Sequence, residues 1–231
     1  LVHDDHPPRK LSRTGHTSWT ISDVDFFDGP YDPSNTSATT MQPSGTTGNI
    51  TITASTNVFV ANDVGRLIRI KNGTDWGFAK ITGFTSATLV DATVNADMPF
   101  AATSANADWR LGSFYTGNYP TKITFFEERL FYAGTTQQPS TVFSSMSADF
   151  DKFSPTAKNG DVADDNALQF TIVSDQVNQI TGLYGGKFLA IFTKIFTDPG
   201  FRLIHDSQRV LLICRPQRTC IILRMGFECN R

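Results

Sequence analysis

The chain has 231 residues, of which 39% are hydrophobic and 18% are charged, and its formal net charge is -2. This length and hydrophobic content predict one large or two small domains with a real core, and they exclude a disordered chain. The small net charge excludes a globally basic nucleic-acid-binding protein, so partners must be selected by local surfaces. There is no uninterrupted apolar run of about 18 residues, so we expect no membrane span.

Residues 1–44 are polar and irregular in pattern. Prolines interrupt any periodic pattern of apolar residues, at Pro7-Pro8, Asp28-Gly29-Pro30 and Asp32-Pro33. We interpret this region as an extended arm and the start of the main β domain. The sequence opens with Leu1 in the middle of a pattern, so we expect a fragment of a longer protein.

Two groups of polar side chains in this region are candidate ligand sites. The first group is His3, Asp4, Asp5 and His6. Imidazoles and carboxylates bind zinc or harder divalent ions, but this spacing matches no metal motif, so we predict no metal and no cofactor. The second group is a small basic patch at Arg9, Lys10 and Arg13. Such a patch could meet phosphate, although three charges are more typical of solvated surface.

Residues 45–112 show a different, alternating pattern. In residues 48–54, GNITITA, apolar and polar side chains alternate, which indicates a half-buried strand. Further strands are expected at 58–60, 67–70, 76–81, 89–94 and 109–111. Asn72-Gly73 predicts a hairpin turn, because both residue types tolerate positive φ. Short strands with this punctuation predict an inserted small β-barrel or β-sandwich module.

Residues 113–193 continue as a strand meander. Apolar runs separated by turn residues predict strands at 123–126, 130–133, 141–145, 168–172, 180–183 and 188–192. Together with the abundant Thr and Phe, they predict an all-β chain. Propeller blades and ordinary antiparallel sheets both fit this region, because no clean repeat of about 40 residues is visible.

The composition changes near the end of the chain. Residues 202–231 contain six Arg, no Lys and two acids, a net charge of 6 - 2 = +4, which leaves -6 for residues 1–201. All three cysteines lie here, at Cys214, Cys220 and Cys229, with a spacing that matches no zinc signature. We interpret residues 194–231 as an aberrant or poorly ordered tail, frameshifted or foreign in origin. A genuine functional tail is the alternative.

Several segments share a pattern with one protein family. They are HPPRKLSRTGHTSW at 6–19, DVGRLIRI at 63–70, FFEERLFYAGT at 125–135, QPSTVFSS at 138–145 and VADDNALQFTIVSDQVNQI at 162–180. These segments resemble the nozzle proteins, also called tail tubular protein B, of short-tailed bacteriophages. The resemblance implies a propeller-like antiparallel sheet domain with an inserted β module.

The same resemblance implies a function and partners. It implies a structural component of the phage tail that forms part of the DNA ejection conduit. It also implies a ring-shaped homo-oligomer, a hexamer, that contacts tail adaptor and fibre proteins and carries DNA only as transient cargo. The expected location is the virion tail, after assembly in the cytoplasm of the bacterial host.

An enzyme is the first alternative that the residues suggest. A glycosidase could use acids such as Glu127-Glu128, Asp164-Asp165, Asp149 and Asp151. Adjacent strand residues point to opposite faces, so neither adjacent pair makes a site by itself, and we expect surface or turn positions. His205 is the only histidine after residue 16, which leaves little material for nucleophilic catalysis. We therefore predict no enzyme and no catalytic residues.

A carbohydrate-binding adhesin, or another tail-associated glycan-binding β protein, is the second alternative. Aromatic side chains stack on sugar rings, and the candidate platform is Trp19, Trp76 and Trp109. Each tryptophan stands in an apolar strand context or beside a glycine. We therefore expect all three to serve in packing.

Overall fold

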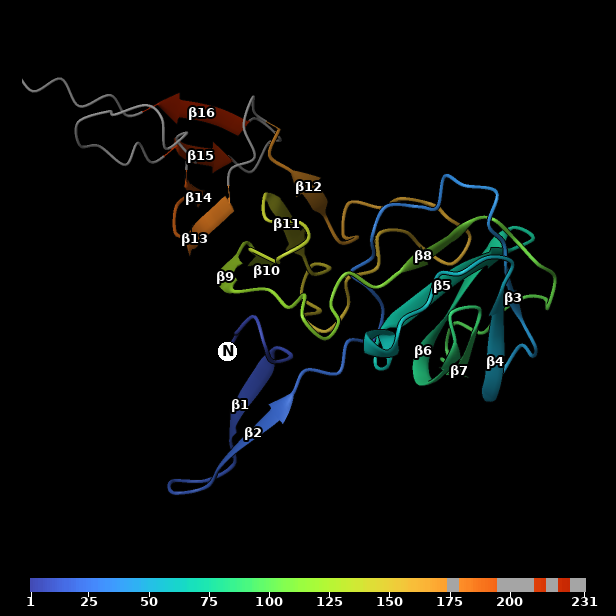
Figure 1. Cartoon of the computed structure of the whole chain (residues 1–231). Coiled ribbons are helices and arrows are strands. Elements are labelled where there is room, and N and C mark those ends of the chain that lie inside the picture. Colours follow the sequence, from blue (N-terminus) through green and yellow to red (C-terminus); the bar gives the residue numbers. More distant parts are fainter. Residues whose placement is uncertain (174–178, 195–209, 215–219, 225–231) are drawn as a thin grey trace, which may run out of the picture.

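The computed structural model of the protein describes residues 1–173, 179–194, 210–214 and 220–224. These residues form an all-β structure of antiparallel sheets, which confirms the predicted class. Figure 1 shows a curled sheet, a group of smaller sheets and a two-stranded arm that projects away from both. Among the described residues, no helix has the length and apolar character needed to cross a bilayer.

The largest sheet has six strands in the order β3-β4-β7-β6-β5-β8. Its strands are β3 (Met41–Pro43), β4 (Asn49–Ala54), β5 (Leu67–Asn72), β6 (Asp75–Ser86), β7 (Leu89–Val94) and β8 (Trp109–Leu111). Five of them fall on segments expected from sequence. The expected strand at 58–60 is wrong, because these residues lead into a short 3₁₀ helix, η1 (Ala61–Asp63).

This sheet curls strongly into a half-barrel, where a small barrel or sandwich was expected. Two register shifts in β6, at Ile81/Gly83 and Phe84/Ser86, supply part of the curl, because bulges increase local twist. Met41 in β3 and Asn106 exchange backbone hydrogen bonds of 2.8 and 3.0 Å, which links one edge of the sheet to the segment before β8. The concave core includes Ile52, Phe59, Ile68, Ile70, Ile81 and Val90.

The turn between β5 and β6 lies one residue later than expected. Asn72 pairs with Asp75, so the two loop residues are Gly73 and Thr74, with Gly73 at φ 66. Glycine at the first loop position is typical of a type II′ hairpin turn. Asn72 is instead the buried last residue of β5, and its amide donates to the Ser104 carbonyl at 2.9 Å.

Two four-stranded sheets follow, and each is a meander in chain order. The first contains β9 (Lys122–Phe126), β10 (Arg129–Ala133), β11 (Thr141–Ser144) and β12 (Gln169–Thr171). The second contains β13 (Gln179–Gly185), β14 (Leu189–Lys194), β15 (Val210–Cys214) and β16 (Cys220–Arg224). The expected strands at 180–183 and 188–192 are confirmed, since they form the β13–β14 hairpin. The described residues form no propeller.

The two central strands of the first four-stranded sheet, β10 and β11, are buried on both faces. Phe131, Ala133 and Val142 pack with Ile180 and Ile191 of the second sheet. The alternate residues face a second cluster, whose buried members are Phe114, Leu130, Tyr132, Phe143 and Phe153. Since successive strand residues point to opposite faces, these runs of apolar residues hold layers on both sides.

The tail expected at 194–231 is described only in part. Residues 210–214 and 220–224 form β15 and β16, which pair antiparallel and extend the β13–β14 sheet. Cys214 and Cys220 are register partners there. His205 and Cys229 lie outside the described residues.

A polar junction ties the half-barrel to the chain segments on both sides of it. The Arg66 guanidinium contacts both Asp32 and Asp63 and donates to the Gly112 carbonyl at 2.5 Å. The Asp32 carboxylate also accepts from the Ser113 hydroxyl at 2.9 Å and the Gln138 amide at 2.6 Å. Burial raises the pKa of Asp32, and the hydrogen-bond donors oppose that rise.

A second polar contact lies next to this junction. Asp28 is fully buried and accepts hydrogen bonds from the hydroxyls of Tyr31 and Ser154, each at 2.5 Å. Burial, the Asp28 charge and the hydrogen bond to Asp28 raise the pKa of Tyr31 well above its ordinary value. The Tyr31 phenol therefore remains a donor to a carboxylate that water does not reach.

We expect Tyr31→Phe to lower the free energy of unfolding by about 2 kcal/mol, because a buried carboxylate loses one of its donors. Urea denaturation measures the change. The matched control is Tyr184→Phe, which removes a hydroxyl from an exposed side chain and should change stability by less than about 0.5 kcal/mol. Equal effects of the two substitutions would show that the Asp28 contact contributes nothing.

The raised pKa of Tyr31 also predicts a pH dependence. The folded state holds this proton more tightly than the unfolded state does. Its contribution to stability is therefore complete below about pH 10 and declines as the pH rises above the unfolded-state pKa. Alkaline denaturation of Tyr31→Phe should accordingly be shallower than that of the wild type, as followed by circular dichroism. Parallel curves would contradict the assignment.

Candidate functional site

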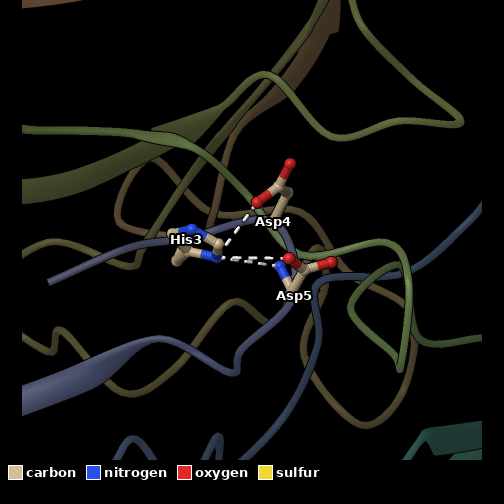
Figure 2. A group of neighbouring side chains, drawn as sticks. All are labelled: His3, Asp4 and Asp5. Carbon is tan, nitrogen blue, oxygen red and sulfur yellow. Dashed lines mark hydrogen bonds and ion pairs between the residues drawn. The ribbon is translucent and has the colours of Figure 1, made fainter.

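The group of candidate metal ligands at the start of the chain forms an exposed turn. Nδ1 of His3 lies 3.0 Å from Asp4 Oδ1 and 3.9 Å from Asp5 Oδ2, as Figure 2 shows. The same Nδ1 is 3.1 Å from the backbone N–H of Asp5, which can donate to it. His6 contributes a ring at 5.4 Å from the His3 ring. These contacts are local to one solvated turn.

Backbone hydrogen bonds join the turns that carry Glu127-Glu128 and Asp164-Asp165 at one corner of the first four-stranded sheet. Glu127 and Glu128 form the β9–β10 turn, and the Ala148 N–H donates to the Glu128 carbonyl at 2.8 Å. The Ser147 N–H donates to the Asp165 carbonyl at 3.0 Å, which joins the loop around Asp165 to the same corner. Both adjacent acid pairs are exposed, as expected from sequence.

Arg129 organises this corner through backbone carbonyls. Its guanidinium donates to the carbonyls of Ser145 at 2.9 Å, Asn166 at 2.6 Å and Asp164 at 2.7 Å. Burial lowers the pKa of Arg129, and the charge of Asp165 opposes that shift. The arginine thus ties the loops together, and neither of the two surface hollows identified among the described residues is lined by these acids.

The backbone at this corner is strained. Three non-glycine residues have positive φ in the described structure: Glu127 at 46°, Glu128 at 58° and Ala148 at 59°. All three belong to the two turns joined by the Ala148–Glu128 hydrogen bond. A left-handed conformation costs an L residue about 1–2 kcal/mol, and glycine is the usual residue in such a turn. Two carboxylates therefore occupy positions where local stability favours glycine.

The three tryptophans do not form a sugar-stacking platform. Trp109 pairs with Ile70 and Trp76 pairs with Lys71, and these two neighbours on β5 point to opposite faces of the half-barrel sheet. Both side chains are half-buried. The packing role expected for Trp19 is wrong, because this side chain is 56% exposed on the projecting arm.

The projecting arm is a β-hairpin that the sequence interpretation missed. It consists of β1 (Arg9–Arg13) and β2 (Trp19–Asp23), which pair antiparallel across their full length. Figure 1 shows it extending away from the sheets. Nine of its ten strand residues are exposed, Ser12 being half-buried. The interpretation of residues 1–44 as irregular is therefore wrong for this segment.

Register places the apolar side chains of the hairpin on one face. Leu11 pairs with Ile21, and Arg13 pairs with Trp19, whose ring centre lies 5.5 Å from the guanidinium. Arg9 pairs with Asp23 through an ion pair of 3.0 Å. Paired residues share a face, so one side of the ribbon is apolar and arginine-rich. The other side carries Lys10, Ser12, Thr20 and Ser22.

No protein-family model matches the chain, and no curated protein matches it. Its function is therefore inferred from the surfaces described above. Two of these surfaces have unusual features. The hairpin has an exposed apolar face, and the corner at Glu127 and Glu128 has strained backbone and exposed carboxylates.

The strained turn gives a direct prediction. We expect Glu127→Gly combined with Glu128→Gly to raise the free energy of unfolding by about 1 kcal/mol, because glycine adopts positive φ without steric cost but loses more chain entropy. The matched control, Glu127→Ala with Glu128→Ala, removes the same charges and keeps both Cβ atoms. It should give no such gain in urea denaturation. A loss of stability in the glycine variant would show that the turn is not strained.

Proposed function

We propose that this protein is a structural component of a bacteriophage tail, of the nozzle type, and that it acts by self-association around a DNA conduit. The observation that carries the proposal is the hairpin arm, which holds an apolar face in solvent and projects from a rigid β body. Such an arm is typical of subunits that complete their packing in an assembly. The segments that resemble phage nozzle proteins give the kind of assembly.

The rest of the described structure supports a mechanical role. The strands β10 and β11 are buried on both faces, and the junction around Asp32 and Arg66 joins the half-barrel to the sheets. Within the described part of the chain, the candidate acids line neither of the two surface hollows, which favours a surface role over catalysis.

We further propose that the two four-stranded meanders are neighbouring blades of a propeller-like domain. Each meander has the sequential order of a propeller blade, and the sheets pack through Val142, Ile180 and Ile191. The Gly185 N–H donates to the Thr124 hydroxyl at 3.0 Å, which brings β13 beside β9.

The charge of the chain agrees with a conduit that does not hold DNA. Residues 1–201 carry a net charge of -6, which would weakly repel a phosphate backbone. A glycan-binding adhesin is less well supported, since two of its three candidate tryptophans are half-buried on opposite faces of one sheet.

Light scattering coupled to size-exclusion chromatography tests the proposed function. We expect the 231-residue chain to form closed oligomers, seen as rings by negative-stain electron microscopy. Tryptophan fluorescence should show no saturable quenching by host polysaccharide. A chain that stays monomeric at high concentration, or that binds polysaccharide saturably, would contradict the proposal.

A further inference from the structure

The apolar face of the hairpin belongs to none of the hydrophobic cores formed by the described residues. Leu11 is 50% exposed, Trp19 56% and Ile21 60%, although register places all three on the same side. The hydrogen bonds of the arm run between its own strands and to Leu1 and Pro8 at its base. An isolated two-stranded ribbon is only marginally stable in water, so burial of this face by a partner would stabilise it.

The acidic corner offers a surface of matching character. Phe125 is 61% exposed and Phe150 is 41% exposed, and their rings lie 5.2 Å apart in an edge-to-face pair. Glu127 and Glu128 flank them on the strained turn, and neither has an ion-pair partner within the part of the chain that the structure describes. We call this surface, formed by Phe125, Glu127, Glu128 and Phe150, the Phe–Glu corner.

We propose that the apolar face of the hairpin of one copy docks onto the Phe–Glu corner of a second copy. The surfaces match in both hydrophobicity and charge. The apolar face itself carries Arg9 and Arg13 against Asp23, a net charge of 2 - 1 = +1. Residues 9–23 as a whole, with Lys10 on the opposite face, carry 3 - 1 = +2. Removing this from the -6 of residues 1–201 leaves -8 for the remainder, so the arm is basic on an acidic body. Complementary charge favours encounter and fixes orientation.

The contact is intermolecular because the arm projects away from the sheet that carries the corner (Figure 1). It joins two different surfaces and is therefore heterologous, which generates a ring when the rotation closes. This inference rests on the proposed function, since it names the surfaces through which the chain would self-associate. The docking would also explain the strained Glu127-Glu128 turn, because this turn presents two carboxylates next to exposed aromatic rings.

The first test removes the apolar face and keeps the strand propensity. Leu11→Thr combined with Ile21→Thr should raise the dissociation constant between copies on the order of tenfold to a hundredfold, because central apolar contacts dominate interfaces. Sedimentation velocity measures it. The matched control, Thr20→Ala with Ser22→Ala, alters the opposite face and should associate as the wild type does. Equal effects of the two variants would overturn the docking mode.

The second test pairs two charge reversals. One variant carries Arg13→Glu, and the other carries Glu127→Arg with Glu128→Arg. Each alone places like charges across the interface and should associate about tenfold more weakly. An equal mixture matches every arm to an oppositely charged corner, so association should return to the wild-type level. Circular dichroism checks that each variant is folded.

The outcomes separate this inference from the proposed function. Recovery in the mixture alone supports docking of the arm on the Phe–Glu corner. Wild-type association by both charge variants, or a mixture that stays dissociated, overturns the docking while self-association stands. A wild-type chain that does not associate overturns the proposed function itself.

Discussion

The contact between Asp32 and Arg66 is the constraint on which the arrangement of this protein depends. Arg66 belongs to the turn before β5, Asp32 to the N-terminal segment, and Gln138, the third partner, to the loop before β11. One carboxylate thus joins three parts of the chain. Burying a charge is costly, and the cost is met here because several donors satisfy it. The half-barrel and the sheets keep a fixed relation as a result.

Around this junction, almost every apolar strand face finds a layer to pack against. The first four-stranded sheet is covered on both sides, and the half-barrel closes over its own core. The hairpin arm departs from this pattern, since its apolar face is covered by no layer of the residues that the structure describes. A rigid body with one uncovered ribbon has the features of a subunit that completes its packing in an assembly.

Sequence reasoning could predict the strands that lie over a core, because burial selects alternating residues such as Ile50 and Ile52 in β4. It missed β1 and β2 because these strands do not lie over a core of the described residues. Leu11 stands alone among charged and polar neighbours, and its partner Ile21 becomes visible only through cross-strand register. A small barrel was one of the two forms expected for the half-barrel sheet, but the bulges in β6 that help to curl it could not be predicted, since they depend on pairing with β7.

The candidate site was predictable only in its parts. The turn at Glu127 and Glu128 was predicted correctly. The packing of Phe150 on Phe125 was not, because nothing in the sequence indicates it. In the sequence, Asp32 was noted only as part of an Asp-Pro pair that interrupts periodic structure. Its role in the junction is evident only from the structure, where Ser113 and Gln138 donate hydrogen bonds to it. Such contacts join residues that are far apart in the chain, so they cannot be predicted from local sequence patterns.

The central claim is that this chain builds an assembly through complementary surfaces of neighbouring copies. Electron cryomicroscopy of the self-associated 231-residue chain tests it most directly. The account predicts closed head-to-tail rings, with density for the hairpin of each copy lying over Phe125 and Phe150 of the next. Hairpins that fold back on their own copy, or copies related only by isolated two-fold contacts away from the arm, would contradict it.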